Sequence, residues 1–454
     1  MQRFAPLYCC LISLSGCQEK SNASQEWPLA TTESSPENLG WLGEAECCGE
    51  DPHAVDGAGL PDGRVALVGK SFLKPEEENT LASSPFLVVV QPARGRQNTW
   101  AEPDAISIRY APASQGAFLQ VVTMQEKLYV VGHEGSPPQA KLWVFSSASG
   151  ELLTSLLLDA ATAGEASAFE SITPDSQGGL YLGGVQQSNV DAFEGFKSYG
   201  NVTRGQAVLV HLSASSLDST LLPERPDDIF SFPDWVSFKS LKALSTGSVV
   251  GVTSTREEVS AVIQIAANGA EEWRYLEPGP YEITDVAIDA QEEPNFLLSG
   301  HGGDDTIDGH VTRLNAKGEP IWSRSFGNSG YNNDSDVSLL SAPRSLIYDE
   351  CWGIQVDAQG RAYLACGTGI EGCDSLSGRE KRDCENDPRV LWRSLCISFS
   401  PNGDELWRRT ESFVEQGTRR ESAAEYLLFN SEGELEVVQD HDFGIGLLSL
   451  SSVD

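Results

Sequence analysis

The chain has 454 residues and carries 31 Lys and Arg against 66 Asp and Glu, a formal net charge of −35 at pH 7. This acidity argues against a nucleic-acid partner, because binding a phosphate backbone requires a surplus of basic side chains. Hydrophobic residues make up 40% and charged residues 21% of the sequence. This composition is typical of a folded protein and not of a disordered one.

The N-terminus has the pattern of an export signal. Arg3 precedes a mostly apolar run from Phe4 to Gly16, which is too short to cross a bilayer as a helix. The segment LSGC that ends at Cys17 resembles the lipobox of bacterial lipoproteins. This resemblance implies cleavage before Cys17 and attachment of a diacylglycerol to its sulfur. The other interpretation is an ordinary signal peptide with an incidental cysteine.

The residue after the cysteine is Gln18 and not Asp. In a bacterium with two membranes, the resemblance to lipoproteins then implies the outer membrane. Residues 18–40 are rich in Ser, Glu, Thr and Pro without apolar periodicity, and they read as a flexible tether. We therefore expect a signal peptide at 1–16, a tether at 17–40 and a folded domain at 41–454. Anionic headgroups would repel so acidic a domain, so the lipid alone would hold it at the membrane.

Short apolar strands that end in glycine recur along the chain, each after a turn rich in Gly, Asp, Ser or Gln. They are Val65–Gly69, Leu128–Gly132, Leu180–Gly184, Val249–Gly251, Phe296–Gly300 and Ala362–Gly367. A seventh strand, Leu435–Val438, lacks the glycine. This regular recurrence indicates a repeat architecture.

A second kind of strand is followed by a turn that contains glycine, and a tryptophan stands four residues after that glycine. These tryptophans are Trp273, Trp322 and Trp407. The fixed offset predicts a large ring packed between neighbouring sheets. Stacking on a carbohydrate is the alternative role.

Together the two kinds of strand predict four-stranded antiparallel blades, seven of which close into a single β-propeller. The last repeat has room for only three strands before Asp454, so we expect its fourth strand to come from about residues 38–50 and to close the ring. A two-sheet sandwich is the alternative fold.

The strand–glycine and Gly-x-x-x-Trp segments resemble the β-propeller repeats of exported bacterial proteins and, more loosely, those of pyrroloquinoline-quinone-type propellers. The resemblance covers about residues 50–454 in degenerate form, without the WD-type or kelch signatures. It implies a fold and little about activity.

In such a repeat the turns between strands 1 and 2 and between strands 3 and 4 are expected to be short. Long connections then gather on the opposite rim, because antiparallel strands alternate in direction. We expect them at 185–205, 301–309, 323–347 and 368–390, and we place the binding surface there.

Export to an oxidising compartment favours disulfides. Zinc binding is less favoured, because the sequence has no C-x-x-C pair. Cys351 and Cys366 are equidistant from a turn at 357–360, so they should face each other across a hairpin. Cys373 and Cys384 would then close the next loop. Cys47 and Cys48 are expected to form disulfides that staple the closing seam, and Cys396 is the candidate for a leftover thiol.

The loop 301–309 contains Asp304, Asp305 and Asp308, an oxygen-rich set that could hold Ca²⁺ or be a plain solvated loop. His133 and His301 follow the glycine strands near the mouth of the ring. Each is expected to be a surface histidine, with a general acid or base as the alternative. No G-x-S-x-G, H-E-x-x-H or P-loop motif occurs.

The sequence thus predicts a monomeric, lipid-anchored, surface-exposed propeller that binds an extracellular protein or glycan through its loop-bearing face. It favours the absence of enzyme activity without deciding the question. The alternative is an exported propeller enzyme, either a Ca²⁺-assisted hydrolase or a quinone-type oxidoreductase.

Overall fold

The computed structural model describes the chain between residues 42 and 450. Gaps in this description fall at 44–49, 73–82, 92–105, 112–114, 136, 159–165, 189–204, 218–221, 224, 290–292, 304–306, 327–345, 372–377, 380–392, 412, 416–417, 421, 432 and 442–443. Within the described residues, no helix is long and apolar enough to span a bilayer.

Blades 1 to 3 follow one another along the chain, and each pairs its strands in sequence order. Their strands are β2 to β5 (Glu50–Gly59, Val65–Phe72, Ser83–Val90, Ile106–Tyr110), β6 to β9 (Gly116–Met124, Lys127–Glu134, Gln139–Ser146, Leu152–Leu157) and β10 to β13 (Ala166–Pro174, Leu180–Ser188, Gln206–Leu212, Asp228–Phe232). All pairs are antiparallel, as predicted.

Blades 4 to 6 continue the same pattern. Their strands are β14 to β17 (Ser240–Ala243, Val249–Ser254, Ser260–Ile265, Glu271–Leu276), β18 to β21 (Tyr281–Asp289, Asn295–Gly302, Asp308–Leu314, Pro320–Phe326) and β22 to β25 (Leu346–Val356, Ala362–Glu371, Arg393–Phe399, Glu405–Glu411). A small hairpin, β26 (Phe413–Glu415) and β27 (Thr418–Arg420), leads on to blade 7.

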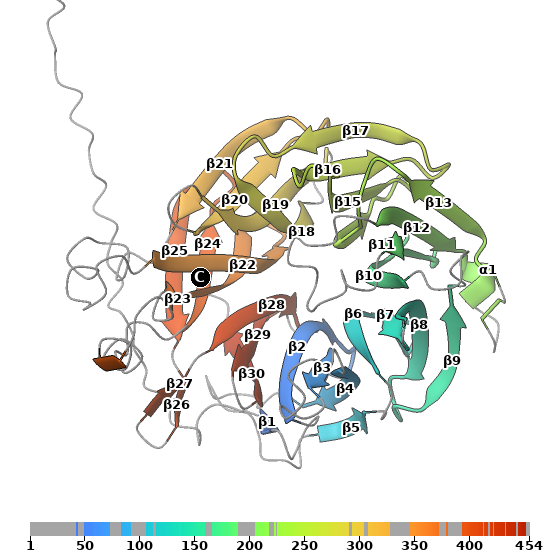
Figure 1. The fold of residues 1–454 in the computed structure, drawn as a ribbon, viewed down its shortest axis with the longest axis horizontal. Helices are drawn as coiled ribbons and strands as arrows, with labels where there is room; N and C mark the ends of the chain where they lie inside the picture. The colour runs from blue at the N-terminus through green and yellow to red at the C-terminus, as the bar shows by residue number, and fades with distance from the viewer. Residues whose placement is uncertain are drawn as a thin grey trace, which may run out of the picture.

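Blade 7 joins the two ends of the chain. It consists of β28 (Ala423–Phe429), β29 (Leu435–His441), β30 (Gly444–Leu450) and the short N-terminal strand β1 (Leu42–Gly43). β1 runs antiparallel to β30, with Leu42 opposite Ile445. The first strands labelled in Figure 1 surround one axis, and β14 contacts β10 and β18 on either side. The seven-bladed propeller and its closure by the N-terminal strand are therefore as predicted.

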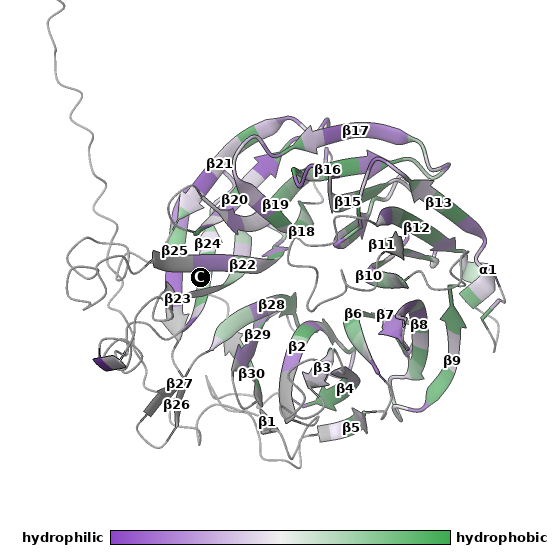
Figure 2. Ribbon diagram, viewed as in Figure 1, coloured by the Kyte–Doolittle hydropathy of each residue, from purple (hydrophilic) through white to green (hydrophobic). Residues whose placement is uncertain are grey.

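The core lies between the blades. Strands in the middle of a blade are buried on both faces, and for this reason they read as continuous apolar runs. One core cluster, which contains Val68, Phe118 and Trp143, joins blades 1 and 2. Similar clusters lie between other neighbouring blades. The outer strands β17 and β21 carry mostly hydrophilic residues (Figure 2).

The innermost strand carries a β-bulge in six of the blades, always near its middle. The extra residues are Val55, Leu119, Glu170, Thr284, Trp352 and Glu425. The bulge presses a backbone carbonyl against the second strand. A Cβ on Gly69 or Gly132 would lie 1.9 Å from the carbonyl oxygen of His53 or Ala117. The bulge is thus the reason why these strands end in glycine.

Residues at or close to the bulge position of the innermost strand link each blade to the next one. The bonds run from Val121 N to Asp56 Oδ2 (2.8 Å), Ile172 N to Gln120 Oε1 (2.7 Å), Ser171 Oγ to the Phe238 carbonyl (3.0 Å), Ser240 Oγ to Asp285 Oδ1 (2.5 Å), Ile354 N to Asp285 Oδ2 (3.1 Å) and Gln355 Nε2 to the Tyr426 hydroxyl (3.2 Å). Tyr426 also hydrogen-bonds to Asp56. We call this closed series of bonds, which passes through all seven blades, the inter-blade circuit.

Tyr426 closes this circuit as a donor. Burial, with the nearby carboxylates of Asp56 and Asp285, raises the pKa of Tyr426 well above its ordinary value. The phenol therefore stays protonated and donates to Asp56, while its oxygen accepts the bond from Gln355.

One expectation about the connections is wrong. Strands 3 and 4 are joined by tight turns in blades 2, 4, 5 and 6, but blade 1 uses residues 91–105 and blade 3 uses residues 213–227, which include helix α1 (Ala214–Leu217). The tight turns place glycine at a positive φ, as at Gly269 (82°) and Gly318 (77°). Residues 213–227 contain no glycine, so the residue that the other tight turns place at positive φ is missing there.

The repeated tryptophans lie against neighbouring blades. Trp273 of blade 4 packs on Phe296 of blade 5, with ring centroids 5.3 Å apart. Trp322 of blade 5 donates from Nε1 to the Pro401 carbonyl of blade 6 at 2.9 Å. Trp407 packs against the cluster that joins blades 6 and 7.

Blade 6 contains the disulfide that the hairpin geometry predicts, between Cys351 and Cys366, whose Cα atoms are 4.0 Å apart. The turn is longer than expected, because the last pair is Val356 with Ala362, and the bulge at Trp352 restores the alignment. Cys396 is a buried thiol. The other cysteines named above lie outside the described residues: Cys17, Cys47, Cys48, Cys373 and Cys384.

Gly132→Ala should destabilise the protein by about 1–3 kcal/mol, because the new methyl group meets a backbone carbonyl that cannot move aside without breaking the bulge. Urea unfolding measures the change. Gly57→Ala is the matched control, since its new methyl would meet mainly the ends of two leucine side chains at 3.0–3.1 Å. Equal losses of stability in the two variants would contradict the role given to the bulge.

Candidate functional site

The connections between strands 2 and 3 and those between blades meet at one end of the propeller, which we call the loop-bearing end. The predicted loops 185–205, 323–347 and 368–390 fall largely outside the described residues, and Asp304 and Asp305 do so entirely. The structure therefore describes this end through the strand ends that carry the loops.

A layer of polar residues runs around the axis at this end, which we call the polar layer. Most members stand just after the strand glycine or its equivalent, at the bulge, or two residues before the bulge, and the two from blade 4 stand just before its first strand. They are His53, Lys70, His133, Glu170, Ser237, Lys239, Glu282, His301 and Asp440. These residues come from six of the seven blades.

The part of the layer at the seam between blades 7 and 1 contains a buried amine. His53 Nδ1 lies 2.5 Å from Asp440 Oδ2 and so ties blade 1 to blade 7. Burial lowers the pKa of the neighbouring Lys70 to about 8, although the charge of Asp440 partly opposes the shift. Burial, together with the charge of Lys70, lowers the pKa of His133 to about 4.

The part of the layer in blades 3 to 6 is a run of bonded pairs. Ser237 Oγ donates to Glu170 Oε1 at 2.8 Å, and Lys239 Nζ lies 2.5 Å from Glu282 Oε1. His301 Nδ1 lies 3.2 Å from the Cys351 carbonyl oxygen. Burial lowers the pKa of His301. The pairs join successive blades and leave the layer rigid and polar.

The sequence predicts only part of the polar layer. His301 is only 7% exposed, so the expectation of a surface histidine is wrong there. His301 is buried because it directly follows Gly300, which lies against the backbone of the innermost strand. Lys70 and Asp440 were missed, although both occupy the same place in their repeats as His133 and His301.

Metal binding at the loop 301–309 stays a prediction. Among the residues that the structure describes, no three His, Cys, Asp or Glu side chains group in a way that could hold a metal ion. Of the three aspartates, the described one is Asp308, at the start of β20 opposite Gly302.

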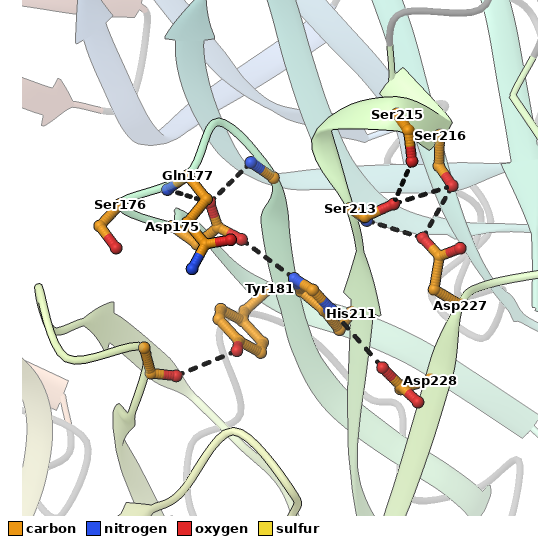
Figure 3. Close-up of polar contacts among 12 residues, drawn as sticks. Asp175, Ser176, Gln177, Tyr181, His211, Ser213, Ser215, Ser216, Asp227 and Asp228 are labelled. Carbon is orange, nitrogen blue, oxygen red and sulfur yellow. Dashed lines mark hydrogen bonds and ion pairs between the residues drawn. The ribbon is translucent and has the colours of Figure 1, made fainter.

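The opposite end of blade 3 carries a second polar network, shown in Figure 3. Asp175 caps the turn before β11 and accepts from His211 Nε2 at 3.0 Å, while Asp228 lies 3.7 Å from Nδ1 of the same ring. Tyr181 stacks on His211 and donates to the Gly247 carbonyl of blade 4 at 3.1 Å. Each of these contacts fastens a turn to its neighbours, so this network supports the fold.

Comparison with known proteins finds structural likeness without sequence likeness. No family model matches the chain, and no curated protein matches its sequence. The solved structures that resemble it include the Pan2 WD40 domain of Neurospora crassa (TM-score 0.46, 9% identity, covering 89% of this chain and 90% of that one).

Two further structures are similar. A protein of unknown function from Bacteroides caccae has a TM-score of 0.37 and 11% identity over 72% of this chain and 89% of its own. The quinohemoprotein alcohol dehydrogenase ADHIIG of Pseudomonas putida HK5 has a TM-score of 0.43 and 9% identity over 92% and 81%. All of these likenesses are distant.

Acidification should test the lowered pKa of the half-buried His133. Its pKa in the folded protein, about 4, lies below the ordinary value of 6.5, so below pH 6.5 the unfolded chain takes up a proton that the folded protein refuses. Stability should therefore fall as the pH drops from 6.5 toward 4. In His133→Gln, the fall in melting temperature between pH 7 and pH 4.5 should be smaller. Parallel curves for the two proteins would contradict the lowered pKa of His133.

Proposed function

We propose that this protein is a binding scaffold held at a membrane surface by a lipid on Cys17, and that it engages an extracellular protein or glycan through its loop-bearing end. One observation carries the proposal: three of the longest connections between strands converge on that end. They are 189–205, 327–345 and 372–392. Variable loops on a rigid support are the usual place for recognition.

The polar layer supports this proposal in a second way. Two pairs of its charged side chains, Lys239–Glu282 and His53–Asp440, are bonded across neighbouring blades. These bonds hold together the strand ends that carry the loops. They therefore give the loops a stiff base, which lowers the entropy cost of binding a partner.

The membrane anchor can be tested in a bacterial host with two membranes. Cys17→Ala should move the protein from the membrane fraction to the soluble envelope fraction, because the sulfur that would carry the lipid is gone. Cys10→Ala, in the apolar run before the cleavage site, is the matched control and should leave the protein at the membrane. A Cys17→Ala protein that stays in the membrane fraction would overturn the anchor.

The binding face can be tested by shortening one long connection at each end of the propeller. Replacing 189–204 with a short Asn-Gly turn should abolish capture of partners from an envelope extract and from a glycan array. Replacing 92–105, at the opposite end, should leave capture unchanged. The opposite pattern of losses would contradict the assignment of the binding face.

A further inference from the structure

A separate polar cluster lies at the loop-bearing end between blades 4 and 5, outside the polar layer. Glu277 follows the last residue of β17, Tyr281 opens β18, His310 lies early in β20, and Ser325 lies near the end of β21. Glu277 and His310 are 5% and 6% exposed. Ser325 is exposed. The exposed hydroxyl of Ser325 therefore lies next to the buried imidazole of His310, and the buried carboxyl group of Glu277 lies behind that ring.

Two side chains hold the Ser325 hydroxyl. Nδ1 of His310 lies 3.2 Å from Ser325 Oγ, and Ser325 Oγ donates to the Tyr281 hydroxyl at 2.9 Å. The Tyr281 ring stacks on the His310 ring, with centroids 4.1 Å apart and planes 14° apart. The stacking fixes the imidazole in the orientation that aims Nδ1 at the hydroxyl.

The other ring nitrogen faces acceptors. His310 Nε2 lies 2.9 Å from Thr312 Oγ1 and 3.7 Å from Glu277 Oε2. When Nε2 carries the proton and donates it to this side, Nδ1 presents its lone pair to Ser325. The arrangement of hydroxyl, imidazole and acceptor is the one that activates serine nucleophiles.

The protonation states are consistent with this arrangement. Burial lowers the pKa of His310 to about 4, so the ring is neutral and able to accept a proton at ordinary pH. Burial raises the pKa of Glu277, which also accepts a hydrogen bond from the Tyr275 hydroxyl at 3.1 Å. The described titratable groups that face His310 are thus Glu277 and Tyr275 from the end of β17 and Tyr281 from β18.

We propose that Ser325 is the nucleophile of an ester-hydrolysing site, with His310 as its general base and Tyr281 as the residue that holds the serine hydroxyl and the imidazole side by side. Thr312 and Glu277 are positioning residues that hold the tautomer of His310. The proposal goes beyond the binding role, and its failure would leave the loop-bearing end as a binding face.

The reaction has two balanced steps. Ser325 Oγ bonds to the acyl carbon and its proton passes to His310 Nδ1; the bond to the leaving oxygen then breaks, and that oxygen takes the proton from His310. In the second step His310 takes a proton from water, the resulting hydroxide attacks the acyl-serine, and Ser325 regains its proton as the acid departs. A base of low pKa favours esters with good leaving groups, such as aryl esters.

The test treats the full folded chain with a fluorophosphonate probe and maps the labelled serine by peptide mass spectrometry. Ser325 should react at least about 100-fold faster than the neighbouring Ser323, because a positioned general base contributes about 10²–10⁴ in rate. Ser323 is the matched control: it lies on the same strand and is exposed, but its hydroxyl contacts Thr312 at 2.8 Å.

Hydrolysis of p-nitrophenyl acetate gives the second readout. Ser325→Ala should abolish it, and Ser323→Ala should keep it. The rate should stay nearly level from pH 8 to pH 5, because His310 is neutral throughout that range, whereas a solvent-exposed histidine base would lose activity below its ordinary pKa of about 6.5. His310→Gln should lose the rate with the melting temperature retained.

Three results would overturn the proposal. They are labelling spread evenly over exposed serines, equal labelling of folded and urea-unfolded protein, and unchanged ester hydrolysis in Ser325→Ala. Because Ser325 is exposed, its alanine variant should fold, so these results stay informative even where His310→Gln does not fold.

Discussion

The structure depends on the contact between successive innermost strands. Each blade is a sheet buried on both faces, so no blade can shield its own apolar surface, and the ring must close for any of it to be stable. The inter-blade circuit makes that closure specific. It ends where Tyr426 of blade 7 meets Asp56 of blade 1, beside the seam that His53 and Asp440 also bridge.

The bulges set the positions of most other features. A bulge forces glycine into the facing strand, as at Gly69 and Gly132. It places a polar side chain, such as Gln120, within reach of the next blade. In blade 6 it brings Cys351 opposite Cys366. Most residues of the polar layer lie at the loop-bearing end because they flank these bulges and the glycines that face them.

The repeats could be predicted from sequence because strand, turn and glycine recur at similar places, and the three-strand final repeat predicted closure by the N-terminus. The bulges could not be predicted, since nothing in the period-2 pattern of one strand reveals an extra residue in its partner. For this reason the sequence pattern places Gly251 in the same class as Gly69, although Gly251 lies against the side chains of Phe238 and Leu241 and not against a bulge carbonyl. Of the polar layer, the sequence predicts only the two histidines. Lys70, Glu170 and Asp440 come close to them only when the blades are aligned in the folded ring. The Ser325 cluster joins residues from two blades and leaves no motif in the chain.

The central claim is that the circuit closes through Asp56 and Tyr426, and a double-mutant cycle in urea unfolding tests it most directly. The variants are Asp56→Ala, Tyr426→Phe and the two combined. We expect a coupling free energy of about 1 kcal/mol or more, as for a buried hydrogen bond to a carboxylate. Additive losses, agreeing within about 0.5 kcal/mol, would show that the two side chains act independently and would contradict the closed circuit.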